Sequence, residues 1–230
     1  LNLFDGRYAD ITGPVNGEYL LYTVSEDSLK ISKTGTNGEA LFTQNLECDL
    51  LFQRFSGIWL LRDGRVAYVL AGGYNLTLTL HMLSADLQPL WNAVEQYPSD
   101  GKILMAESPD GKILLAVEPY VQIFDAAGGK LFTQSLAVTD ELYTHPKYMV
   151  VLPANDRGIF LWHDILNRRQ MIKMQVLNTD GTLVHGSSGI ALEDRLAGVC
   201  DGARWRHQCF SLGNRFLSIW MERRHETSLT

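Results

Sequence analysis

One hexapeptide occurs twice in this chain with almost no change. Residues 41–46 read Leu-Phe-Thr-Gln-Asn-Leu, and residues 131–136, 90 positions later, read Leu-Phe-Thr-Gln-Ser-Leu. Residues 90–94, which read Leu-Trp-Asn-Ala-Val, lie about midway between them and also follow a polar turn. Three similar strands at a spacing of about 45 residues indicate a chain built from repeated units of that length.

The third unit shows the clearest order of strands and turns. Apolar and β-branched runs at 102–106, 113–117 and 121–124 alternate with polar turns, which is typical of β-strands. The first turn, 108–112, reads Ser-Pro-Asp-Gly-Lys. Proline restricts φ to the value that the first central position of a turn requires, and the aspartate side chain can hydrogen-bond to the backbone of the same turn. Gly111 is expected to take the positive φ that precedes the next strand.

This unit resembles the inner hairpin of blades in WD-repeat-like and bacterial Ser-Pro-Asp-Gly-type β-propellers. The resemblance implies an all-β fold, a β-propeller of about five four-stranded blades in one domain over residues 1–230. It carries no catalytic residue with it. The blades are expected at residues 7–46, 50–94, 101–136, 143–192 and 198–230.

The two ends of the sequence are compatible with two interpretations of the number of blades. Residues 228–230 and 1–6 together resemble a third strand with its turn, so pairing of the terminal segments could close one blade and remove open strand edges. Only about 32 residues separate Gly6 from Gly38, however, which is short for a whole blade. The alternative is a compact first blade at 7–46 in a fragment of a six- to eight-bladed propeller.

The net charge and the apolar runs limit the classes of partner, and the cysteines bear on the cellular compartment. The net charge of −6 gives no basic field for a polyanion, so we expect no nucleic acid, and no apolar run is long enough for a membrane span. Cys200 and Cys209 are nine positions apart across a predicted Asp-Gly turn. A disulfide between them would imply an extracellular or periplasmic protein, whereas two buried free thiols are the alternative.

The common catalytic and cofactor motifs do not occur in the sequence. It lacks a Gly-x-Ser-x-Gly elbow, a His-Glu-x-x-His helix, a Cys-x-x-Cys pair and a phosphate loop. We therefore predict no cofactor and no metal site. The leading interpretation is a non-enzymatic binding or protein-interaction module, monomeric, with a protein or carbohydrate ligand.

Charged residues in the predicted loops supply the candidate binding residues. Acidic residues recur after the fourth strand of each unit, and basic residues gather late in the chain, which would place both on one face of a propeller. The candidates are Asp140, Glu141, Glu193, Asp194, Arg168 and Arg223. The alternative function is a glycoside-acting hydrolase or lyase, because such enzymes use a pair of carboxyl groups, here from the same acidic residues.

Overall fold

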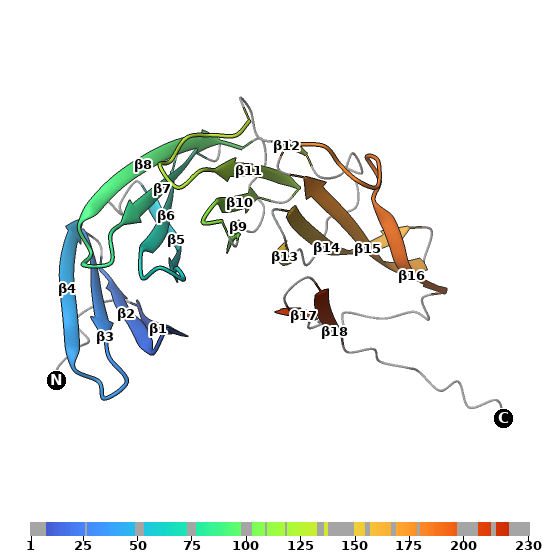
Figure 1. The fold of residues 1–230 in the computed structure, drawn as a ribbon. Helices are drawn as coiled ribbons and strands as arrows, with labels where there is room; N and C mark the ends of the chain where they lie inside the picture. Colours follow the sequence, from blue (N-terminus) through green and yellow to red (C-terminus); the bar gives the residue numbers. More distant parts are fainter. Residues whose placement is uncertain are drawn as a thin grey trace. The chain divides into compact units, whose positions relative to one another are not determined.

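The computed structural model of this chain consists of β-strands and turns. It describes residues 8–25, 27–48, 53–72, 77–97, 103–108, 110–117, 119–132, 136–137, 150–154, 157–166, 169–178, 180–196, 207–212 and 215–220. No helix occurs in these ranges, and hence none long and apolar enough to cross a membrane (Figure 1). The all-β prediction is confirmed.

The described strands form four four-stranded antiparallel sheets and one hairpin, with the strands of each sheet in chain order. The first sheet holds β1 (Tyr8–Val15), β2 (Glu18–Val24), β3 (Ser28–Thr34) and β4 (Ala40–Glu47). The second holds β5 (Gln53–Leu60), β6 (Val66–Gly72), β7 (Thr77–Leu83) and β8 (Pro89–Gln96). The third holds β9 (Ile103–Glu107), β10 (Ile113–Val117), β11 (Tyr120–Phe124) and β12 (Leu136–Ala137). The fourth holds β13 (Val150–Ala154), β14 (Arg157–Leu166), β15 (Arg169–Asn178) and β16 (Ile190–Leu196), and the hairpin pairs β17 (His207–Leu212) with β18 (Arg215–Trp220).

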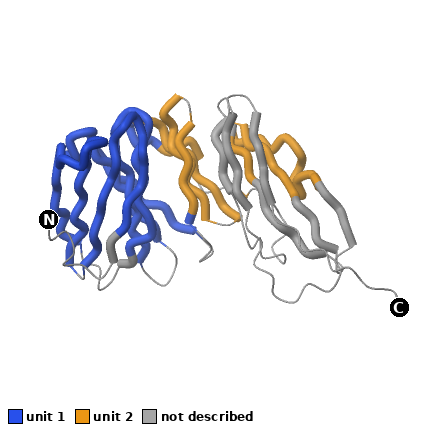
Figure 2. The backbone as a smooth tube through the Cα atoms, turned by 90° about the horizontal axis from the view of Figure 1, so that it is seen from below, with its two compact units in different colours: residues 1–103, 127–129 blue, residues 104–126, 130–230 orange. Residues whose placement is uncertain are grey.

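The chain divides into two compact units (Figure 2). The first comprises residues 1–103 and 127–129, and the second comprises residues 104–126 and 130–230. One domain over residues 1–230 therefore stays a prediction. Residues 1–6 and 228–230, which were expected to close a blade together, lie outside the described residues. The described strands show that residues 8–47 contain a complete four-stranded sheet by themselves.

A five-residue turn with one hydrogen-bond pattern joins strands at several places in both units. The N–H of its first residue donates to the carbonyl of the fifth, and the N–H of the fourth donates to the carbonyl of the first. The turns that share this pattern are 35–39, 61–65, 84–88, 108–112 and 178–182. The fourth residue has positive φ in each, and four of these five are glycines, including Gly111 as predicted. In the turn 84–88 the fourth residue is instead Leu87, with φ 67°.

Leu87 shows what offsets the strain of a bulky residue in this conformation. A left-handed backbone costs an L-residue about 1–2 kcal/mol because Cβ approaches the following carbonyl oxygen. The Leu87 side chain is fully buried in the core of the first unit. Burying a leucine side chain stabilises the fold by about 1.5–3 kcal/mol, which is enough to offset the strain.

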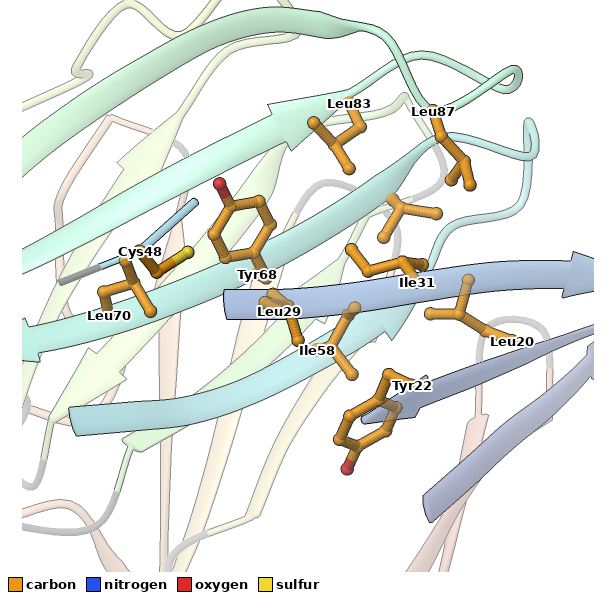
Figure 3. Packing of buried hydrophobic residues seen from close by; sticks show 11 residues of the cluster. Leu20, Tyr22, Leu29, Ile31, Cys48, Ile58, Tyr68, Leu70, Leu83 and Leu87 are labelled. Carbon is orange, nitrogen blue, oxygen red and sulfur yellow. The ribbon is translucent and has the colours of Figure 1, made fainter. Parts of the chain in front are cut away.

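The core of the first unit forms between the β1–β4 and β5–β8 sheets. Alternate residues of β2 and β3 point into it, among them Leu20, Leu29 and Ile31, each without exposed surface. Figure 3 shows Leu29 lying close to Ile58 and Tyr68 of the second sheet. The alternation follows from the period of two in a strand, so the neighbouring residues of β2 and β3 face the other way.

Lys33 is a buried charged residue at the junction of these two sheets. Its Nζ atom lies 2.7 Å from a carboxylate oxygen of Glu18 and donates to the carbonyl oxygens of Gly64, at 3.2 Å, and Ala85, at 2.9 Å. The Lys33 side chain is 1% exposed, and the ring centroid of Phe42 lies 5.9 Å from Nζ. One ammonium group therefore ties β2 and β3 to two turns of the second sheet.

A second core lies in the other unit and joins the β9–β12 and β13–β16 sheets. Leu114 and Ile123 pack there with Phe160 and Leu177. Phe132 also lies against the turn glycine Gly181, because a Cβ built at Gly181 would be only 2.6 Å from the Phe132 Cε1 atom. Two features therefore favour glycine at this turn: its φ of 87°, which a side chain would strain, and the Phe132 ring, which leaves no room for a Cβ.

Two fully buried glutamines, one in β11 and one in β15, hold the chain that follows their strands. Gln122 accepts a hydrogen bond from the N–H of Phe132 at 3.2 Å and donates to the carbonyl of the same residue at 2.9 Å. Gln175 accepts from the N–H of His185 at 3.1 Å and donates to the carbonyl of Gly186. Each side-chain amide thus takes the place of a peptide group in the sheet ladder.

Candidate functional site

The face of the β1–β4 sheet opposite the core carries a row of paired residues across all four strands. Ile11 of β1 pairs with Leu21 of β2, Leu21 with Ser32 of β3, and Ser32 with Thr43 of β4. Directly paired residues share a face, so their side chains are neighbours. A second row, nearer the turn, joins Tyr19, Thr34 and Ala40.

A cavity of about 400 Å³ opens over these two rows. Its volume falls within the range of small-molecule sites, about 300–1,000 Å³. The cavity extends over all four strands and the turn between β3 and β4. Its lining residues are Ile11, Tyr19, Leu21, Lys30, Ser32, Thr34, Gly35, Thr36, Gly38, Ala40 and Thr43.

The chemistry of the lining changes across the sheet. β1 and β2 contribute apolar and aromatic side chains, with Ile11 at 55% exposure. β3 and β4 contribute hydroxyl groups, and the hydroxyls of Ser32 and Thr43 are 3.1 Å apart. Lys30 is the charged residue of the lining. The site therefore has an apolar wall, a hydroxyl wall and one cation.

The candidate residues named from sequence do not coincide with this cavity. Asp140, Glu141, Arg168 and Arg223 lie outside the described residues, so their predicted role in binding stays a prediction. Glu193 and Asp194 were expected in a loop, and this placement was wrong. Both lie inside β16, where their backbones pair with Ile172 and Met171, because β16 extends to Leu196.

The possible disulfide between Cys200 and Cys209 is not described. Cys200 lies outside the described residues, and Cys209 is placed only as a backbone position of β17, opposite Ser218. The extracellular or periplasmic location, which such a bond would support, stays a prediction. In the described part of the chain, no group of three or more His, Cys, Asp or Glu side chains is arranged to hold a metal ion.

Sequence reasoning missed the cavity because its residues are ordinary strand and turn residues. The available signal was the alternation in β3, where Leu29 and Ile31 alternate with Lys30 and Ser32. That pattern predicts one apolar face and one polar face for the strand. It does not predict that the apolar residues Ile11 and Leu21 would lie beside the hydroxyl residues, since this depends on the register of β1, β2 and β3.

Three titratable side chains, two buried and one half-buried, lie in or beside the core of the first unit. The rings of Tyr68 and His81 stack with centroids 4.5 Å apart. Burial raises the pKa of Tyr68, and electrostatic repulsion from Cys48 raises it further. Burial lowers the pKa of His81. Burial raises the pKa of the Cys48 thiol, partly offset by a hydrogen bond with the Leu29 backbone. These shifts favour the neutral form of all three groups, which fits a structural role in the core.

The lowered pKa of His81 predicts a pH dependence of stability. As the pH falls below about 6.5, the unfolded chain takes up a proton at this histidine before the folded chain does. The contribution of neutral His81 to folding stability is therefore fully present above that pH and is lost on acidification. We expect the urea midpoint of the protein to fall from pH 7.5 to pH 5.5. A His81→Gln variant should show a smaller fall, and an equal fall in both proteins would contradict the assignment to His81.

No protein-family model matches the sequence, and no curated protein matches it.

Proposed function

We propose that this protein is a non-enzymatic binding module built as a β-propeller of about five four-stranded blades, and that the face of the β1–β4 sheet away from the second sheet is left uncovered by a neighbouring blade. Support for the propeller comes from the four sheets with strands in chain order and from the turn that recurs in both units. Further support comes from the stacking within each unit. The first sheet packs on the second through Lys33 and the shared core, and the third packs on the fourth through Phe132 and Gly181.

The observation that carries the binding proposal is the contrast between the two faces of the β1–β4 sheet. One face packs into the core, with Leu20 and Leu29 at 0% exposure. The other carries an open cavity beside the exposed Ile11. Concave sites that combine apolar walls with a few placed polar groups are typical of ligand-binding surfaces. A rigid sheet holds such a site in place.

Methyl-resolved NMR tests the binding proposal face by face. A fragment library is titrated into protein labelled at the methyl groups of isoleucine and leucine. We expect some fragments to shift the methyl signals of Ile11 and Leu21, which line the cavity, while Leu20 and Leu29 stay unchanged on the buried face. If no fragment shifts the cavity methyls, or if Leu20 moves as far as Leu21, this face is not a binding site.

A further inference from the structure

We propose that the cavity on the β1–β4 sheet binds an organic anion with an apolar body, the anionic group lying at Lys30. This inference rests on the proposed binding function and names its ligand class. The residues that line the cavity include one cation, Lys30, and no acidic residue, while the carboxylate of Glu39 lies beside the lining residue Gly35. The protein as a whole has a net charge of −6, so a local cation in a concave site gives this surface a sign opposite to the average.

The hydroxyl wall supplies hydrogen-bond donors that suit an anion. Ser32 and Thr43 are within hydrogen-bond distance of each other, at 3.1 Å, and that bond uses the proton of only one of the two hydroxyls. The other proton remains available to an acceptor in the cavity. Thr34 lies beside them in the second row. Hydrogen bonds from such donors to an ionised acceptor are stronger than those between neutral groups.

The apolar wall argues against a polyhydroxylated ligand. The side chains of Ile11 and Leu21 form no hydrogen bonds, so sugar hydroxyl groups placed over β1 and β2 would be left without partners there. An aromatic or aliphatic body would instead bury its apolar surface against these two residues. The ring of Tyr19 extends the same wall.

The carboxylate of Glu39 sets the orientation of the anion. A Cβ built at Gly35, at the turn end of the cavity, would collide with the Glu39 carboxylate. An anionic group is therefore disfavoured at the turn end. Lys30 lies away from the turn, paired with Thr23 and Asn45. The anionic group of the ligand is accordingly directed toward Lys30.

Two fluorescent probes that share one apolar body test this inference. The sulfonate 8-anilinonaphthalene-1-sulfonate is compared with N-phenyl-1-naphthylamine, which lacks the sulfonate. We expect the charge reversal Lys30→Glu to weaken binding of the sulfonate by about five-fold or more, since it replaces attraction with repulsion, and to change binding of the neutral amine by less than about two-fold. The matched variant Lys130→Glu changes the net charge equally at an exposed residue outside the cavity and should leave both affinities unchanged.

The outcomes separate this inference from the proposed function. Ile11→Asp places a charge in the apolar wall at an exposed edge-strand residue and should abolish binding of both probes. If Ile11→Asp abolishes binding while Lys30→Glu affects both probes alike or neither, the cavity binds ligands but does not select anions, and the inference is overturned. If both probes bind Ile11→Asp as tightly as the unchanged protein, or bind neither protein, the binding proposal fails as well.

Discussion

Replacing Lys33 with methionine should destabilise the protein by about 2–4 kcal/mol, close to the range for removing one partner of a buried ion pair. Methionine is similar in length and keeps the apolar contacts of the lysine stem, so the change isolates the ammonium group. Its loss leaves the carbonyl groups of Gly64 and Ala85 without this donor and Glu18 without its cation. Glu18 is 30% exposed and keeps access to water, which places the cost below that of a fully buried carboxylate.

Lys30→Met is the matched control for this change. Lys30 and Lys33 belong to the same strand, and the two variants have the same composition and net charge. Lys30 is exposed on the opposite face of the sheet, so its replacement should change stability by no more than about 0.5 kcal/mol. Urea unfolding followed by circular dichroism gives both values. Equal effects in the two variants would show that Lys33 does not join the sheets energetically.

Gly181→Ala should destabilise the protein by about 2–4 kcal/mol, through left-handed backbone strain and overpacking together. The added methyl group would lie 2.6 Å from the Phe132 ring, so the ring or the turn must move. Gly38→Ala is the matched control, because Gly38 has a similar φ of 79° but no atom within 4 Å of its added Cβ. That variant should cost only the backbone strain, about 1–2 kcal/mol.

A double-mutant cycle with Phe132→Ala separates the two contributions. Once the ring is removed, the cost of Gly181→Ala should fall to that of Gly38→Ala, because only the backbone strain remains. The measurement is the urea midpoint and slope of the four proteins in the cycle. An unchanged cost in the Phe132→Ala background would show that the Phe132 ring does not rest on this turn.

The local structure of this chain could be predicted from sequence because it depends on local signals. The turn at 108–112 is specified by its own residues, and Gly111 takes the expected positive φ. The strand alternation in β2 and β3 likewise places Leu20 and Leu29 in a core. The closure of these sheets into a propeller was not predictable in the same way, since it depends on contacts between segments far apart in the sequence, and it remains a proposal.

Two features of the structure had no local signal in the sequence. Lys33 follows the same pattern of alternation as the core residues Leu29 and Ile31, and a lysine at such a position is ordinarily read as exposed. Its burial is explained by acceptors that come from Gly64 and Ala85, 31 and 52 residues away. The positive φ of Leu87 could not be predicted from its neighbours in sequence either, because a leucine in this conformation is tolerated through its burial in the core.

The buried glutamines Gln122 and Gln175 bear on how this chain can tolerate changes in length. Each fixes one point of the segment that follows its strand, at Phe132 in one sheet and at His185 and Gly186 in the other. Because the anchor is a side chain, the residues between that point and the next strand need not keep a fixed number to preserve the pairing of the sheet. Loops inserted just after Phe132 or just after Gly186 should therefore be accepted without loss of register, which makes these two places suitable for grafting foreign peptides.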